Sequence, residues 1–345
     1  MRIGFDASPL ALPHPRGVQR VVARSLEALE ARGKVEVVRL TPPEGAGLRR
    51  WRQRELPRQA EGLAGIHSFL SAFPLRGPGK RVQTIHELPW RHGVAENAGW
   101  KHKLWARLGP RRADAVVTAT QFTAAELGLR SHGEGGKLFV VPWGVDERFT
   151  EEPPPGVVDE TLLTTYRLGE GAFVLALGAV RAKKNLAATL QGLAHLKGMG
   201  GPMPQLVVTG GDTPDLRRDL GLAQKLGLTR YVSTLEALDE EHLPGVLRLA
   251  ACVVVLSRSE GFGLPVLEAA ACGTPAVVPR GSAQAEVAGP DAFQVDPEDA
   301  GSVAAGLREA IQRREELRYV LPEQARAYTW SRTAQGIERV WEAIA

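Results

Sequence analysis

The stretch SRSEGFGLPVLEAAACGTPAVVP, residues 257–279, decides how the rest of the chain is interpreted. An apolar run at 252–256 precedes it and predicts a buried strand, a glycine-rich loop follows, and helical spacing begins near Leu264. Pro265 suits a first helical turn, and Gly273 is typical of a helix end. Unpaired N–H groups and the helix dipole at such an N-terminus favour an anion. The sequence therefore predicts a phosphate-binding turn between a strand and a helix.

Two glutamates of this stretch, Glu260 and Glu268, are eight positions apart. Glu268 falls one turn inside the predicted helix, where a carboxylate would repel a phosphate, so it is better suited to accept hydrogen bonds from a pair of hydroxyls such as a ribose diol. Glu260, on the loop, would reach another part of the same ligand. The alternative is that both acidic residues merely benefit from the helix dipole.

Apolar runs alternate with helical patterns along the whole chain, which predicts an α/β protein with parallel sheets and helices on both faces. The expected strands are residues 3–7, 35–40, 82–86, 115–118 and 137–141, then 173–177, 205–209, 231–234, 252–256 and 276–278. Helical spacing is found at 18–29, 122–129, 186–197, 216–226, 241–250 and 264–272.

Between the two alternations lies TEEPPPGVVDE, residues 150–160, which is rich in proline and acid and has no periodicity. We therefore expect two doubly wound domains, 1–155 and 156–328, and a terminal helix at 329–345. Ligands of such sheets bind beyond the carboxyl ends of the strands, so we expect the site in a cleft between the domains.

Composition narrows the class of protein. The 345 residues are 43% apolar and 24% charged, with no apolar run near the roughly 20 residues of a membrane-spanning helix. The first residues lack the layout of a signal peptide, and two cysteines in apolar settings argue against a disulfide or metal scaffold, so we expect a cytoplasmic protein. Few asparagines and many prolines would suit a thermophilic source.

The motif EGFGLPVLEAAACGTPAVV resembles the E-x7-E signature of the family 4 retaining glycosyltransferases, which have the GT-B fold of two Rossmann-like domains. The resemblance implies that Glu268 binds the nucleotide ribose and that Glu260 binds hydroxyls of the donor sugar. It also implies that the backbone between them holds the diphosphate and the sugar, through Gly261, Phe262, Gly263 and Leu264.

Four further segments carry the resemblance. LGAVRAKKNL, residues 177–186, is similar to the segment that supplies cations to the diphosphate, and implies this role for Lys184, Lys183 and Arg181. TIHELPW implies that His86 contacts the transferred sugar and donates hydrogen bonds to its oxygens. DASPLALPHPRGVQRV, residues 6–21, resembles the loop after the first strand and implies that Gly17 opens a helix near the acceptor and the diphosphate. The final helix resembles one that braces the first domain.

Other site classes fit the sequence less well. No G-x-G-x-x-G follows the first strand, and no H-E-x-x-H or Asp-x-Asp cluster indicates a metal. Together with these absences, the resemblance implies a metal-independent retaining glycosyltransferase without a cofactor. It would move a hexose, with mannose from GDP-mannose favoured, from a nucleotide-diphosphate sugar to an acceptor hydroxyl, as in polysaccharide biosynthesis. The alternatives are a GT-B sugar-nucleotide epimerase and a catalytically silent nucleotide-sugar-binding protein.

Charge is unevenly distributed. Residues 1–150 hold 24 Lys and Arg and 14 Asp and Glu, a net of +10, whereas the remainder has a net of −6. Two basic stretches with tryptophans, residues 48–58 and 90–112, would suit an anionic glycan or lipid-linked acceptor and peripheral contact with the inner membrane face. They are also compatible with nucleic acid, which we consider the poorer fit, or with a solvated helix face.

Overall fold

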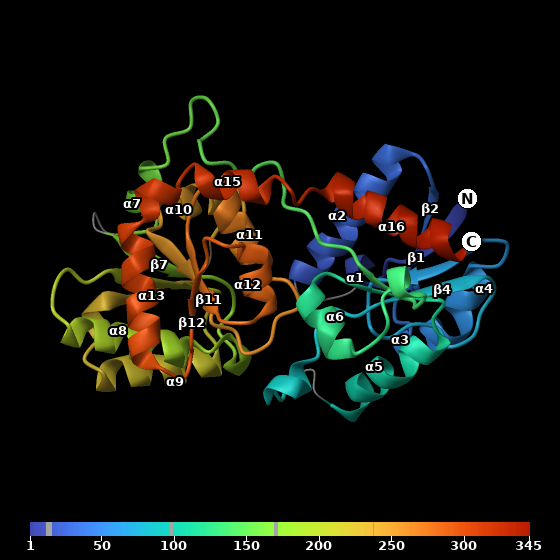
Figure 1. Cartoon of the computed structure of the whole chain (residues 1–345), viewed down its shortest axis with the longest axis horizontal. Coiled ribbons are helices and arrows are strands. Elements are labelled where there is room, and N and C mark those ends of the chain that lie inside the picture. Colours follow the sequence, from blue (N-terminus) through green and yellow to red (C-terminus); the bar gives the residue numbers. More distant parts are fainter. Residues whose placement is uncertain (12–15, 97–98, 169–171, 237) are drawn as a thin grey trace. The chain divides into compact units, whose positions relative to one another are not determined.

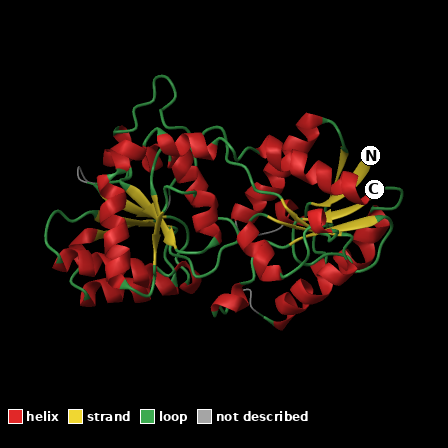
Figure 2. Cartoon of the chain, viewed as in Figure 1, coloured by secondary structure: helices red, strands yellow, loops and turns green. Residues whose placement is uncertain are grey.

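The computed structural model describes residues 1–11, 16–96, 99–168, 172–236 and 238–345. Tertiary contacts divide the chain into two compact units (Figure 1). Unit 1 comprises Met1–Gly144 and Tyr328–Ala345, and unit 2 comprises Val145–Ala327. Each unit has helices packed around a central sheet (Figure 2). The proline-rich segment 150–160 therefore belongs to unit 2.

Unit 1 is built on a parallel sheet of six strands in the order β2-β1-β3-β4-β5-β6. The strands are β1 Arg2–Asp6, β2 Glu36–Leu40, β3 Gly65–Ser68, β4 Lys80–Thr84, β5 Ala115–Thr118 and β6 Leu138–Val140. The helices are α1 Ser8–Ala11, α2 Arg16–Arg32, α3 Leu48–Arg50, α4 Leu56–Gln59, α5 Trp100–Arg112, α6 Gln121–Leu127 and α16 Trp330–Ile344, with a π-helical turn at Trp51–Glu55 and 3₁₀ turns at Pro89–His92 and His132–Glu134.

Unit 2 has a second parallel sheet of six strands, in the order β12-β11-β10-β7-β8-β9. The strands are β7 Phe173–Ala176, β8 Gln205–Thr209, β9 Val232–Leu235, β10 Cys252–Val254, β11 Ala276–Pro279 and β12 Phe293–Val295. The helices are α7 Thr161–Thr165, α8 Leu186–Gly198, α9 Pro214–Lys225, α10 Leu243–Leu249, α11 Leu264–Ala271, α12 Ala283–Ala288, α13 Ala300–Gln312, α14 Arg314–Leu317 and α15 Val320–Ala325, with 3₁₀ turns at Ala182–Lys184 and Thr229–Tyr231.

Central strands of both sheets are apolar because they are covered on both faces. In β10 and β11 every residue is buried, and the same holds for β5 and β7 except for Ala176. This explains why unbroken apolar runs, rather than alternating ones, marked these strands in the sequence. The α/β class with two doubly wound parallel sheets is confirmed.

The last helix, α16, packs on α2 and completes unit 1. Arg32 of α2 donates two hydrogen bonds of 2.9 Å to the carboxylate of Glu338, which is 2% exposed. The hydroxyl of Thr333 donates to the carbonyl of Pro142 at 2.8 Å. A β-carbon on Gly144 would lie 2.3 Å from the backbone nitrogen of Trp330, so the chain passes too close here for any side chain.

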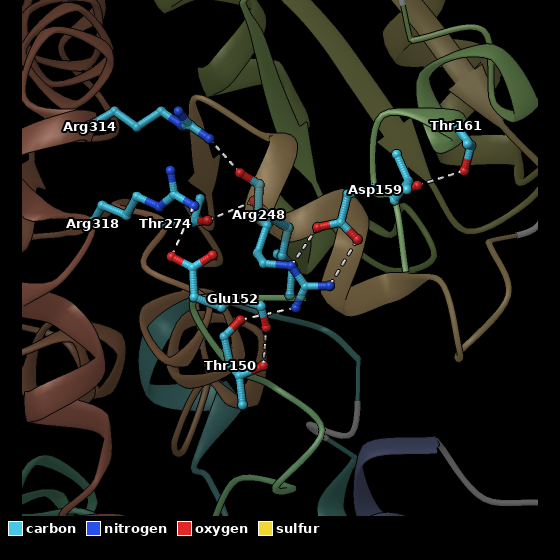
Figure 3. A network of polar contacts seen from close by, with 10 residues as sticks. Thr150, Glu152, Asp159, Thr161, Arg248, Thr274, Arg314 and Arg318 are labelled. Carbon is cyan, nitrogen blue, oxygen red and sulfur yellow. Dashed lines mark hydrogen bonds and ion pairs between the residues drawn. The ribbon is translucent and has the colours of Figure 1, made fainter. Parts of the chain in front are cut away.

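A buried arginine fastens segment 150–160 to the body of unit 2 (Figure 3). The guanidinium of Arg248, in α10, donates to both carboxylate oxygens of Asp159, at 2.6 and 2.9 Å, and to the carbonyl of Thr150 at 3.0 Å. Arg314 in turn donates to the carbonyls of Arg248 and Ala250. The segment has the composition of a linker, yet its two ends are tied to one side chain.

None of the helices in the described part of the chain has both the length and the apolar character needed to cross a bilayer.

Replacing Asp159 with Ala should lower the free energy of unfolding by about 3–5 kcal/mol, because it leaves the Arg248 guanidinium buried without a counter-charge. Urea unfolding followed by circular dichroism measures this change. Arg313→Ala, which breaks a solvent-exposed pair with Glu316, is the control and should leave stability nearly unchanged. Equal losses in the two variants would contradict a stabilising role for the buried pair.

Candidate functional site

The strand order of unit 2 places two loops side by side. Strands β7 and β10 are neighbours at the centre of the sheet, and the chain continues from β7 toward one edge and from β10 toward the other. At such a switch point the loops beyond the carboxyl ends diverge and leave room for a ligand. The loop after β7 carries Lys183 and Lys184, and the loop after β10 carries Glu260.

Lys184 and Glu260 meet across this point. The ammonium Nζ of Lys184 donates to Oε1 of Glu260 at 2.7 Å, and the two side chains are 23% and 18% exposed. Burial raises the pKa of the Glu260 carboxyl, but the charges of Lys184 and Lys183 and the bond to Lys184 outweigh it and lower this pKa to about 2. Glu260 is therefore a carboxylate at neutral pH, able to accept hydrogen bonds but not to donate them.

Arg258 joins the same two loops, and its role was not predicted. Its backbone N–H donates to the carbonyl of Lys183 at 2.8 Å, and its guanidinium donates to Oδ1 of Asn185 at 3.4 Å. Asn185 is buried and left-handed, with φ of 55°, a conformation that asparagine tolerates better than most residues. This turn ends the 3₁₀ helix with the two lysines and starts α8, so Arg258 holds the turn that presents Lys184.

The N-terminus of α11 has the features of an anion site. Gly263 precedes the helix with φ of 101°, and a β-carbon there would lie 3.3 Å from Cγ of Gln284. A side chain at this position would be strained by the positive φ and would crowd Gln284. Gln284 also donates to the carbonyl of Ser257 at 3.2 Å and so fixes the start of the loop. Pro265 lies in the first turn, as predicted.

The loops after β7 and β8 also touch. The backbone N–H of Gly178 donates to the hydroxyl of Thr209 at 3.0 Å. Gly210 has φ of 112°, and a β-carbon on it would lie 2.3 Å from the nitrogen of Ala179. The close approach of these backbones fixes the first part of the loop that leads to the lysines.

The other predicted donor-binding residues of unit 2 differ in exposure. Glu268 lies in α11 and is only 4% exposed, and Gly261 and Phe262 are also buried. Leu264 is half-buried at the start of α11, and Arg181 is exposed at the N-cap of the lysine turn. Charged side chains are rarely this buried. The burial of Glu268 therefore indicates that its carboxylate is not there merely to interact with solvent.

Two predicted residues, His86 and Gly17, lie in unit 1. Nε2 of His86 is 2.7 Å from the carbonyl of Phe69, which can only accept, so this nitrogen carries the hydrogen. Burial lowers the pKa of His86, and the bond to Phe69 offsets this only in part, so the ring is neutral near pH 7. A neutral His86 offers an acceptor at Nδ1 rather than the predicted donor. Gly17 is exposed near the start of α2.

Comparison with known proteins identifies the family. The model of the family described as "Glycosyl transferases group 1" matches residues 166–328. A D-inositol 3-phosphate glycosyltransferase from Corynebacterium jeikeium (strain K411) is 32% identical over 293 residues, which cover 76% of this chain and 68% of that protein. The chain belongs to the group 1 glycosyl transferases.

For other relatives, the alignment with this chain covers a smaller share of the relative's length. A D-inositol 3-phosphate glycosyltransferase from Stackebrandtia nassauensis is 32% identical over 243 residues, or 65% of the present chain and 53% of the relative. One from Corynebacterium urealyticum is 28% identical over 248 residues, and 57% of its length is covered.

Solved structures agree with the fold. Sucrose-phosphate synthase from Thermosynechococcus elongatus is similar with a TM-score of 0.78 at 20% identity, over 99% of this chain and 98% of that chain. Anabaena Alr3699/HepE, solved in complex with UDP and glucose, has a TM-score of 0.74 at 16% identity, over 98% of each chain. The predicted GT-B fold of this glycosyl transferase is confirmed.

The described residues contain no group of three or more His, Cys, Asp or Glu that could hold a metal ion. Beside the carboxylate of Glu260, the switch point carries ammonium and guanidinium side chains and backbone N–H groups, and these groups suit a diphosphate.

The pair formed by Lys184 and Glu260 should make stability depend on pH. Because the folded state lowers the pKa of Glu260, its contribution is complete above the ordinary value near 4.5 and is lost as pH falls toward about 2. The free energy of unfolding of wild type should exceed that of Glu260→Gln by on the order of 1–3 kcal/mol at pH 6, and this difference should shrink below pH 4.5. Urea titrations between pH 6 and 3 measure both quantities.

Lys184→Met is the matched background for this test. Without the ammonium group, the advantage of Glu260 over Gln that grows from pH 3 to pH 6 should be lost or reversed, because burial raises the pKa of the carboxyl with less positive charge to oppose it. A difference that persists unchanged in that background would mean that another group, not Lys184, stabilises the carboxylate.

Proposed function

We propose that this glycosyl transferase moves a hexose from a nucleoside-diphosphate sugar to an acceptor hydroxyl and retains the anomeric configuration. The observation that supports the proposal is the meeting of Lys184 and Glu260 at the switch point of unit 2, 2.7 Å apart, next to the N-terminus of α11. Cationic groups and N–H groups suit a diphosphate, and carboxylates suit the hydroxyls at either end of it.

Each part of the donor has a corresponding group in unit 2. Lys184 and Lys183, with the N–H groups near Gly263, would neutralise the diphosphate as it leaves. Glu260, a carboxylate at neutral pH, would accept hydrogen bonds from the sugar, and the buried Glu268 would accept them from the ribose. Charge develops on the leaving diphosphate in the transition state, so cations fixed before the reaction accelerate it most.

The reaction we propose needs no metal ion and no covalent enzyme intermediate. The acceptor hydroxyl would attack from the face that the diphosphate leaves, and a diphosphate oxygen would take its proton. The C–O bond to the diphosphate breaks as the bond to the acceptor oxygen forms, and the products are a glycoside and a nucleoside diphosphate.

We propose GDP-mannose as the preferred donor, and this preference rests only on the amino-acid sequences of residues 261–269 and 183–186. The relatives named above act on D-inositol 3-phosphate, and HepE was solved with UDP and glucose, so uridine donors and phosphorylated acceptors belong in the same panel. We assign acceptor recognition to unit 1, in keeping with the net charge of +10 over residues 1–150, which would attract an anionic or lipid-linked acceptor.

Incubation with GDP-mannose, UDP-glucose and related nucleotide sugars should release nucleoside diphosphate from at least one of them. Lys184→Ala should slow this release by at least about 100-fold, because it removes a charge that acts on the leaving group. Lys225→Ala, on the exposed surface of α9, is the control and should leave the rate unchanged. An isomerised donor would indicate an epimerase, and binding without turnover a silent protein.

Glu268→Gln should weaken donor binding at least about tenfold, measured by calorimetry, with a smaller effect on thermal stability. The amide keeps the size of the side chain but replaces one acceptor with a donor, so a ribose diol loses a strong hydrogen bond. If stability and affinity fall together, the glutamate has a structural role. Product anomers, read by NMR, and assays in EDTA test retention and metal independence.

A further inference from the structure

Helix α5 presents an unusual outer surface in unit 1. Its inner side is conventional: Trp105 and Ala106 pack on the apolar cluster around Phe73 and Val116, and the rings of Trp105 and Phe73 lie 6.3 Å apart. A β-carbon on Gly109 would lie 2.2 Å from Nε2 of Gln83, so this side of the helix is pressed against β4. Figure 1 shows α5 at the periphery of unit 1.

The opposite side carries Trp100, Leu104, Arg107 and Arg111, which we call the outer stripe. Their spacing of four, three and four residues places them on one side of the helix. Trp100 is 69% exposed, the largest value among the exposed large hydrophobic residues of the described chain, and Leu104 is 42% exposed. Single exposed apolar residues are ordinary, but two adjacent ones on a helix face that also carries charge are not explained by packing.

The charge around the outer stripe is of one sign. Residues 99–113 contain five Lys and Arg and no Asp or Glu. Some exposed arginines outside this helix have acidic partners, as Arg217 has Asp212 and Arg39 has Glu30. By contrast, Arg107 and Arg111 form no ion pair with any residue that the structure describes.

We propose that the outer stripe docks on the surface of an anionic lipid bilayer. Tryptophan favours the boundary between headgroups and acyl chains, leucine gains from burial beside it, and the arginines are attracted by the negative surface potential. The long side chains of Arg107 and Arg111 can lie along the apolar region while their charged ends stay at the headgroups.

A nucleic acid fits this surface less well. Proteins that bind single strands combine positive charge with a series of aromatic side chains on which successive bases stack. The outer stripe offers one exposed aromatic ring, and Leu104 next to it cannot form hydrogen bonds with a base or a phosphate. This inference goes beyond the proposed transfer reaction and does not depend on it, since vesicle binding is measured without donor or acceptor.

The test is flotation of the full chain with vesicles of phosphatidylcholine alone or with 30% phosphatidylglycerol added. We expect at least about tenfold stronger partition to the anionic vesicles, weakened at high salt. The double variant Arg107→Glu with Arg111→Glu should reduce partition at least about thirtyfold. Each arginine near an anionic surface contributes about 1 kcal/mol, and a tenfold change in partition corresponds to about 1.4 kcal/mol. Trp100→Ala should reduce it about tenfold.

The matched control is Lys225→Glu with Arg230→Glu, which changes net charge equally but lies in unit 2 on exposed positions outside α5. It should keep at least half of the binding. Thermal unfolding of the outer stripe variants should match wild type, so that a loss of vesicle binding reports lost docking and not lost folding.

Three results would overturn the proposal: no binding to either vesicle, equal loss in the stripe variant and the control, or binding insensitive to every substitution. Binding of a labelled single-stranded oligonucleotide that falls with Trp100→Ala, with no binding to anionic vesicles, would also overturn it and favour nucleic acid.

Discussion

The pairing of a lysine with a glutamate at the centre of the second sheet is the interaction on which the candidate site depends. Neither residue would be stable in this position alone, because each is largely buried and charged. Together they bring the loop after β7 against the loop after β10, and the backbone bond from Arg258 to Lys183 adds a second connection. The charged side chains of the candidate site therefore also hold its two loops together.

This arrangement also explains the glycines of the loops. Gly263 precedes α11 in a left-handed conformation, and Gly210 allows the backbone after β8 to approach Ala179. The charged pair lies on the loops that these glycines help to shape. The diphosphate that we propose for this site would therefore meet donors already in place, and little of its binding energy would be spent on reordering the protein.

Much of this could be predicted from the sequence, because strong local signals coincide with the elements. Continuous apolar runs predicted β7 and β10, and the strand-loop-helix pattern around Glu260 predicted the turn before α11. Two short strands were missed. β3, Gly65–Ser68, contains a histidine and a serine, and β12 has only three residues, so neither forms an apolar run.

Tertiary partners could not be predicted in the same way. Arg258 lies inside the motif itself, but its bond to Asn185 joins residues 73 positions apart that only the folded sheet brings together. Similarly, the composition of segment 150–160 indicates a flexible connection, whereas Arg248, almost ninety residues later, binds both of its ends. Composition predicts how a segment behaves in isolation, and it does not show that a buried side chain elsewhere in the chain will fix the segment in place.

The packing of α16 on α2 has a consequence for biosynthesis. Unit 1 takes its first strand from the beginning of the chain and its last helix from residues that follow all of unit 2. On the ribosome, unit 2 has every residue it needs before α16 has been made, while Arg32 must wait for Glu338. We therefore expect that unit 2 can fold before α16 closes unit 1, although unit 1 begins earlier in the chain.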